Sequence, residues 1–365
     1  MQQISRYQMF ALLVLFQLGT TIIFGFAAEA GRDAWLVSII CTCLGALVVL
    51  FYLLIYRMTG GLMLVEWFPY VFGKWLGTPL SWLYPLLFVY NAARIISDIR
   101  FLFPVTILHG TPDWVIAVTF LLVVLYGLFS GIEVVSRLAG FLPPVILVFL
   151  ILEIILLWGS GSLDITNSVP IVGEGWGRVW DAVWPLGLMQ TYGESIEFAL
   201  FWAYVSKKDK LLGSTLGGTM LAGICITIMD FIAVAGMGEG VFQRMMYPAF
   251  ALLKLSSLSN FLENLDALGV MYLMVTAFIK MSLHLFAATI CIRQLAVVKK
   301  QGGVIVIVTL VAFLMSLSMV VSFTEHLQVA KNVLPSQLWV PLFVVLPGAA
   351  FVGVLIKKWR RGTAV

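Results

Sequence analysis

Ionisable side chains interrupt long apolar stretches of this sequence, and their types suit the binding of a small charged ligand. They form three pairs whose members are three or four residues apart: Glu194 and Glu197, Arg94 and Asp98, and Lys280 and His284. Residues at this spacing share one face of an α-helix. A carboxylate such as Glu194 can accept a ligand ammonium, carry a proton, or accept the free amides of an interrupted helix. We favour the first and third roles, without ranking them.

The pair Arg94 and Asp98 has two interpretations. A charge at the centre of a membrane span costs at least about 2.5–3.5 kcal/mol on insertion scales, so each one needs a partner. The two side chains either pair with each other, or one of them turns to a ligand or to the stretch that holds Glu194. Tyr90 continues the same helical face.

Two other carboxyl groups and the remaining motifs indicate no chemistry. Glu153 and Asp230 lie nearer the ends of their apolar stretches, and we expect them to reach toward water. The sequence shows no pattern of a hydrolytic triad, a metal cluster or a phosphate-binding glycine loop. We therefore expect no enzymatic activity, no metal, no cofactor and no nucleic-acid partner.

The composition places these residues in a membrane. Of 365 residues, 61% are hydrophobic and only 11% charged, and the mean hydropathy is +1.04. A soluble domain has roughly a quarter of its residues charged. The apolar runs do not alternate, so we expect an all-α polytopic membrane protein forming a single transmembrane domain over 1–365.

Apolar runs and their flanking charges predict ten membrane spans. They are 8–29, 35–56, 81–108, 114–131, 138–158, 180–205, 211–237, 266–293, 304–323 and 336–356. The first run is too long for a typical signal peptide, so we interpret it as a retained span. Most lysines and arginines of the connections, with the basic tail 357–361, fall on one side, which predicts that both termini are cytoplasmic. On the other side, 238–265 is expected to form an extracytoplasmic lid.

The spans divide into two five-helix repeats, 8–158 and 180–356, with an interruption in the first helix of each. Gly19 and Gly25 bracket Thr20, Thr21 and Ile22, while 187–195 holds two glycines, hydroxyl groups and a carboxylate. Paired interruptions predict an inverted-repeat transporter fold with broken first and sixth helices whose unwound backbone contacts a ligand at the bilayer midplane. The alternative is that these small residues only allow close helix packing.

In such a fold, the first, third, sixth and eighth spans surround one cavity. The predicted ligand-binding residues are Gly19, Thr20, Thr21, Ile22, Gly25, Tyr90, Arg94, Gln190, Thr191, Tyr192, Gly193, Glu194, Lys280 and His284. The predicted buried charge network is Arg94, Asp98, Glu194, Glu197 and Lys280.

Several segments together resemble one known family. They are ISRYQMFALLVLFQLGTTIIFG followed by GRDAWL, FLFPVTILHGTPDWV, TYGESIEFALFW, and YPAFALLKLSSLSNFLENLDAL. This pattern is similar to the spore germination receptor B subunit, also called the endospore germination permease family, a branch of the amino acid–polyamine–organocation superfamily. The resemblance covers essentially the whole chain.

The resemblance implies a ten-span protein of the spore inner membrane that binds a small nutrient, often an amino acid, beside an A subunit and a lipoprotein C subunit. Where the family has a Phe-Pro-Phe-Gly-Glu pattern, this chain has the more polar Gln190 to Glu194. The nutrient therefore does not carry over. We expect a nutrient-sensing subunit; the alternatives are a proton-coupled amino acid transporter and a ligand-gated water or ion conduit.

Overall fold

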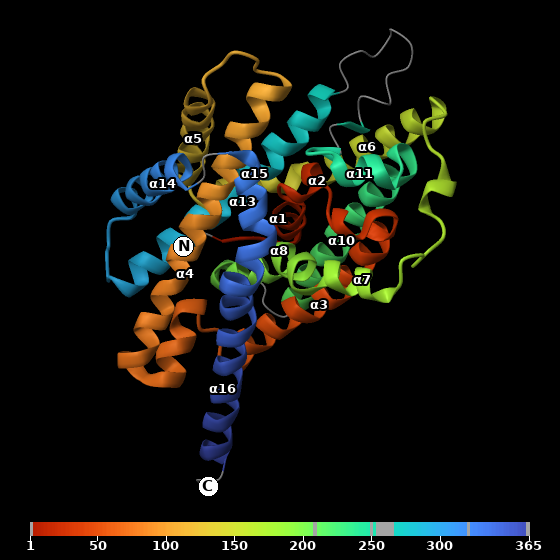
Figure 1. The fold of residues 1–365 in the computed structure, drawn as a ribbon. Coiled ribbons are helices and arrows are strands. Elements are labelled where there is room, and N and C mark those ends of the chain that lie inside the picture. The colour runs from red at the N-terminus through yellow and green to blue at the C-terminus, as the bar shows by residue number, and fades with distance from the viewer. Residues whose placement is uncertain (1–2, 207–209, 249–250, 253–265, 320–321, 363–365) are drawn as a thin grey trace.

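A computed structural model describes residues 3–206, 210–248, 251–252, 266–319 and 322–362. The chain is almost entirely helical in these ranges (Figure 1). Its first half contains α1 (Arg6–Leu18), α2 (Thr21–Phe24), η1 (Ala28–Asp33), α3 (Ala34–Met58), α4 (Leu64–Thr106), α5 (Asp113–Ser130), α6 (Ile132–Gly159) and η2 (Ile165–Ser168). The first helix begins in a capping box, in which Ser5 accepts the Gln8 amide and Gln8 accepts the Ser5 amide.

The second half opens with short, irregular helices and continues with a mixture of long and short ones. The short ones are α7 (Trp176–Ala182), η3 (Val183–Gly187), α8 (Leu188–Thr191), η4 (Gly193–Glu197), α9 (Phe198–Phe201) and η5 (Trp202–Tyr204). They are followed by α10 (Leu211–Met237), α11 (Glu239–Arg244), α13 (Asp266–Leu295), α14 (Gln301–Ser318), α15 (Phe323–Gln328), η7 (Val329–Val333), η8 (Pro335–Val345) and α16 (Leu346–Gly362).

Within the described ranges, seven helices are long and apolar enough to cross a membrane. They cover Ala28–Met58, Asp113–Ser130, Ile132–Gly159, Leu211–Met237, Gly269–Leu295, Gln301–Ser318 and Pro335–Arg360. The three other predicted spans are helical but differ in kind: 8–29 and 180–205 are interrupted, and 81–108 carries charged residues inside α4. An all-helical membrane protein is thus supported, while the number of ten spans stays a prediction.

The long helices pack in pairs that match the expected order of the repeats. α3 packs on α10 and α4 on α13, which are the second with the seventh and the third with the eighth predicted spans. α1 lies at the centre of the bundle, against α6, α10 and α13 (Figure 1). Equivalent helices of two inverted halves would pair in this way, but the repeat itself stays a prediction.

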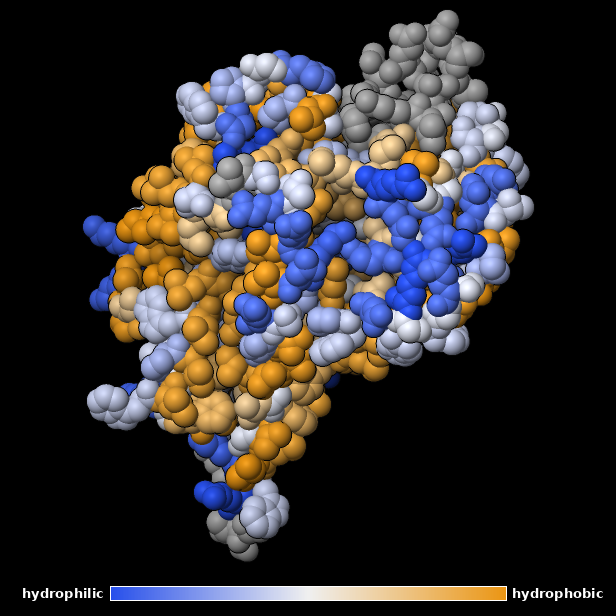
Figure 2. All heavy atoms as spheres, in the orientation of Figure 1, coloured by the Kyte–Doolittle hydropathy of each residue, from blue (hydrophilic) through white to orange (hydrophobic). Residues whose placement is uncertain are grey.

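The surface suits an apolar environment over much of the molecule. Figure 2 shows hydrophobic residues covering large areas, with hydrophilic residues gathered over the region of α7 and α11. α16 projects beyond the bundle to the C-terminus, and its Lys357 donates a hydrogen bond to the Tyr70 carbonyl of α4.

Two buried carboxyl groups contradict the expectation that they reach water. Glu153 on α6 and Asp230 on α10 are each only 3% exposed. Asp230 accepts a hydrogen bond from Ser38 of α3, whereas neither oxygen of Glu153 has a partner among the described atoms. Their positions near the ends of apolar stretches predict access to water, but the packing of neighbouring helices determines their burial.

Candidate ligand-binding site

The first helix is interrupted at Gly19. Its φ of 37° and ψ of −130° end α1, and a short helix, α2, follows and ends at Gly25, where φ is 69°. The Gly19 carbonyl accepts a hydrogen bond from the Thr276 hydroxyl of α13 at 2.6 Å. A carbonyl freed by the break is therefore satisfied by a neighbouring helix, as a bilayer interior requires.

The second interruption is an irregular helix and not an unwound segment. The backbone changes from a π-helical turn, η3, through α8 to a 3₁₀ turn, η4, while Tyr192 keeps helical φ and ψ of −89° and −30°. Tyr52 donates a hydrogen bond to the Gly193 carbonyl at 3.3 Å. This differs from the expectation that 187–195 unwinds, because changes of helical pitch satisfy most of its backbone groups locally.

The two interruptions lie side by side. The hydroxyls of Thr21 and Thr191 are 3.3 Å apart. Two residues before the first break, Gln17 donates hydrogen bonds to the hydroxyls of Ser195 on η4 and Thr219 on α10, at 2.9 and 3.2 Å. Polar side chains thus join the interruptions directly.

A buried ion pair lies next to these breaks. Lys280 Nζ on α13 is 2.7 Å from Glu194 Oε2 on η4, and the two residues are 5% and 6% exposed. The Asn91 amide of α4 donates to the other Glu194 oxygen at 3.0 Å. Three helices therefore converge on one carboxylate.

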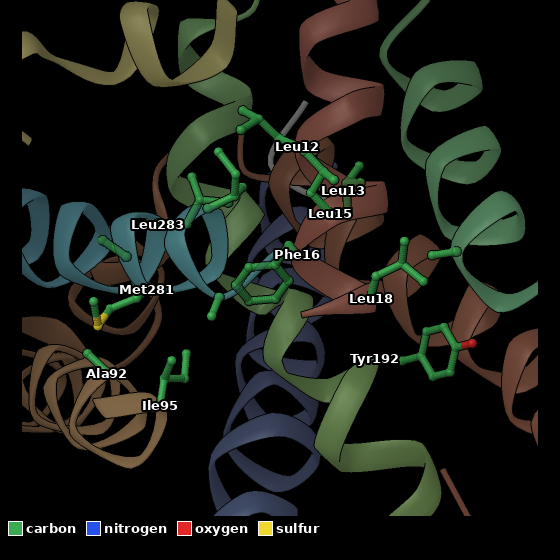
Figure 3. Packing of buried hydrophobic residues seen from close by; sticks show 14 of the residues in the cluster. Leu12, Leu13, Leu15, Phe16, Leu18, Ala92, Ile95, Tyr192, Met281 and Leu283 are labelled. Atoms are coloured by element: carbon green, nitrogen blue, oxygen red, sulfur yellow. The ribbon is translucent and has the colours of Figure 1, made fainter. Parts of the chain in front are cut away.

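A second buried pair lies one turn further along α13. His284 Nδ1 contacts Glu197 Oε1, and neither residue is exposed. The Phe16 ring of α1 packs edge-on against the imidazole with centroids 5.2 Å apart, and Figure 3 shows Phe16 beside α13 near Met281 and Leu283.

Arg94 and Asp98 meet His326, which the sequence analysis did not select. His326 Nε2 on α15 is 2.8 Å from Asp98 Oδ1, and Arg94 Nη2 donates to the His326 carbonyl at 3.2 Å. No direct contact between Arg94 and Asp98 is present among the described interactions, so the first of the two interpretations, a direct pair, is replaced by a shared partner. His326 lies after a predicted span end, although Ser322, which accepts the Glu325 amide, marks the start of the helix that carries it.

These groups surround a cavity of about 170 Å³. Its walls come from the first and second interruptions, α4, α13, α15 and the segment after α11. The predicted site residues that line it are Thr20, Thr21, Gly25, Arg94, Gln190, Glu194, Lys280 and His284, together with Asp98 from the predicted network. Asn91, His326, Glu29, Gln243 and Lys331 are lining residues that the sequence analysis missed.

The other predicted site residues lie elsewhere. Gly19 contacts Lys280 from behind the cavity wall: a Cβ built on it would lie 2.5 Å from Lys280 Cδ. Tyr192 turns away to Thr42 of α3, with the two hydroxyls 2.9 Å apart, while Tyr90 packs against the hydrophobic core. Gly193 and Thr191 form the backbone of the second interruption, and the Ile22 side chain is outside the described part of the chain.

An ionic cluster lies beside the mouth of the cavity. Glu239 of α11 pairs with Arg32 of η1 at 2.5 Å and with Arg178 of α7 at 2.7 Å. Arg178 also donates to the Glu29 carbonyl at 3.0 Å, and the Glu29 carboxylate pairs with Lys331 at 2.5 Å. α11 is the first part of the predicted lid 238–265; most of the rest, 249–250 and 253–265, is outside the described residues.

Acidification is expected to loosen α11. Burial raises the pKa of Glu239, but hydrogen bonds from Arg178 and Arg32 outweigh it and hold the pKa below its ordinary value of 4.5. The stabilisation is present above pH 4.5 and lost as the pH falls through the lowered pKa. Hydrogen-exchange protection of α11 should then be constant from neutral pH to about 4.5 and fall below it. Glu239→Gln should lower protection above about pH 4.5 and approach the wild type at lower pH, where Glu239 is itself protonated. Wild-type protection in this variant at neutral pH would contradict the role of the cluster.

These features define a class of protein. Long apolar helices enclose interrupted ones, and a cavity lined by buried charges lies where the interruptions meet. This is the arrangement of a polytopic helical membrane protein with an internal cavity lined by charged side chains. The chain belongs to the spore germination protein family, because the model of that family matches residues 3–324. The family expected from the sequence motifs is thereby confirmed.

Curated relatives agree with this family. The chain is 24% identical over 359 residues to spore germination protein KB of Bacillus subtilis (strain 168), covering 98% of this chain and 96% of the relative. It is 25% identical over 234 residues to spore germination protein YndE of the same strain, covering 63% and 62% of the two chains. It is 24% identical over 259 residues to spore germination protein XB of Bacillus anthracis, covering 71% of each.

Proposed function

We propose that this protein is the nutrient-sensing membrane subunit of a spore germination receptor and that its cavity binds an amino acid. The observation that carries the proposal is the pairing of opposite charges on one cavity wall. Glu194 and Lys280 lie together, and Arg94 is one turn further along α4 from Asn91, which holds Glu194. A ligand with an ammonium and a carboxylate group matches both ends of this wall.

Each end has a group suited to its part of the ligand. Arg94 Nη1 is buried and has no hydrogen-bond partner among the described atoms, so it is available to a carboxylate. Glu194 can accept the ligand ammonium, which then competes with Lys280 for the same carboxylate. The volume of about 170 Å³ is sufficient for a small metabolite.

Binding at this wall would change how the helices are joined. A ligand ammonium on Glu194 weakens the ion pair with Lys280, which joins η4 to α13. A ligand carboxylate on Arg94 competes with the His326 carbonyl of α15 for the same guanidinium group. The resulting shift between two packings is limited by the difference in the ligand's affinity for them. A partner subunit would detect the shift; the family resemblance implies an A and a C subunit, in the spore inner membrane.

The test is retention of labelled amino acids by proteoliposomes that contain the purified chain, with and without a pH gradient. We expect one amino acid to be retained up to about one molecule per protein, independent of the gradient. Failure of every amino acid to bind would contradict the proposal.

The same test separates the rival functions. A transporter uses the same interrupted helices and internal cavity, and it would give continued uptake driven by the pH gradient. A ligand-gated water or ion conduit would line its path with Arg94, Asp98, Glu194 and Lys280, and it would show conductance in a planar bilayer only with ligand present. Absence of conductance in that bilayer with ligand and all partner subunits present would exclude the conduit.

A further inference from the structure

The contact between Glu197 and His284 has an unusual feature for a buried pair. Glu197 Oε1 touches His284 Nδ1, and both side chains are completely buried. The second oxygen of the carboxyl, Oε2, and the second ring nitrogen, Nε2, have no hydrogen-bond partner within the described residues. A buried polar atom without a partner is rare in proteins and indicates a catalytic role, a strained site or a bound water or ion.

The charges around the cavity balance without this pair. Glu194 is matched by Lys280, Asp98 by Arg94 through their common neighbour His326, and Glu29 by Lys331. An ionised Glu197 beside a neutral His284 would add one uncompensated negative charge in a fully buried place, which is costly. One added proton, on either the carboxyl or the imidazole, removes that charge.

The cavity gives this proton a path. His284 lines the cavity from α13, one turn beyond Lys280, whereas Glu197 lies behind the imidazole and is not among the lining residues. We propose that Glu197 and His284 form an internal proton-binding site, which exchanges one proton with the cavity through the imidazole. This goes beyond the proposed ligand role and does not depend on it.

The transfer is balanced atom by atom. A proton from cavity water binds to the lone pair of His284 Nε2, while the proton on Nδ1 passes to Glu197 Oε1. The imidazole ends neutral with its proton on Nε2, the carboxyl ends neutral, and the water is left as hydroxide. Release follows the same steps in reverse.

The neighbours of the pair set how this proton responds to its surroundings. The charged groups that act on Glu197 and His284 are Glu194 on η4 and Lys280 on α13, and the Cys291 thiol lies further along α13. α1 presents the Phe16 ring and the Gln17 amide, and α10 presents Thr219, none of which titrates. Loss of the Glu194–Lys280 contact would therefore change the electrostatic environment of the proton-binding site directly.

Infrared spectroscopy of the whole chain in lipid nanodiscs tests the proposal. We expect a carboxylic-acid carbonyl band that disappears as the pH is raised, is absent from Glu197→Gln, and persists in the matched control Glu153→Gln, which removes a buried carboxyl of α6 outside the cavity lining. In His284→Gln the band should titrate at a different pH. The proposal is overturned if Glu197→Gln keeps the pH-dependent band of the wild type.

The outcome is decided even if one variant fails to fold. If Glu197→Gln cannot be purified, an unchanged titration in His284→Gln overturns the proposal, and a displaced one supports it. A wild-type spectrum with no pH-dependent carboxylic-acid band across the range in which the protein stays folded also overturns it. Neither measurement uses a nutrient, so failure of the proposed nutrient binding is recognised separately.

Discussion

Replacing Glu194 with Gln and Lys280 with Met is expected to destabilise the protein singly but much less together. Each single change leaves the other member of the 2.7 Å ion pair buried without its counter-charge. Breaking a buried pair costs about 3–5 kcal/mol, whereas replacing both members is often nearly neutral. The midpoint of thermal unfolding in nanodiscs should therefore fall in each single variant and recover in the double variant.

Amino acid retention should not recover with stability in that double variant. Glu194 is the proposed acceptor of the ligand ammonium, and a hydrogen bond to a charged group contributes about 1.5–3 kcal/mol, or roughly a 10- to 100-fold change in Kd. Glu153→Gln is the matched control, because it removes a similarly buried carboxyl on α6 that does not line the cavity. Retention equal to the wild type in the double variant would contradict the binding role of Glu194.

The second large effect is expected at Gly19, where an added methyl group should displace Lys280. The φ of 37° is strained for any residue with a Cβ, at a cost of about 1–3 kcal/mol. The new Cβ would also lie 2.5 Å from Lys280 Cδ and 2.9 Å from the Phe16 carbonyl, which is backbone and cannot move aside. Gly19→Ala should thus lower the unfolding midpoint and abolish amino acid retention.

Gly60 supplies the control that separates strain from displacement. It has a φ of 77°, in the turn after α3, and a Cβ there would meet nothing within 4 Å. Gly60→Ala should therefore cost only the conformational strain, about 1–2 kcal/mol, and leave retention intact. If Gly60→Ala and Gly19→Ala lost amino acid retention equally, the contact of Gly19 with Lys280 would have no role in binding.

The sequence was sufficient where the physical signal is local. Glycines at 19 and 25 and apolar runs of span length are visible without a structure, and so is the shared helical face of Lys280 and His284. The family followed from whole segments of sequence and is confirmed by the match over residues 3–324. The proximity of Glu194 to Lys280 required an assumed fold, since 86 residues separate them.

The sequence was insufficient where a partner comes from a short or distant element. His326 belongs to a six-residue helix, α15, whose approach to α4 no periodicity reveals. Tyr192 shares the polar stretch 187–195, yet it faces Thr42, because the direction of a side chain depends on the local pitch of the irregular helix. No pattern in the sequence indicates the contact of Asn91 with Glu194, because the two residues belong to different helices far apart in the chain.

The N-terminal strand-like contact limits which parts of the molecule can move. Ile4 pairs with the end of η5: its amide donates to the Tyr204 carbonyl at 2.9 Å and its carbonyl accepts the Ser206 amide at 3.2 Å. Hydrogen bonds thus join the segment before α1 to the segment after η5 at one end of the bundle. A separation of the two interruptions that keeps this contact pivots about this end of the bundle and opens toward η1, where Glu239 of α11 pairs with Arg32.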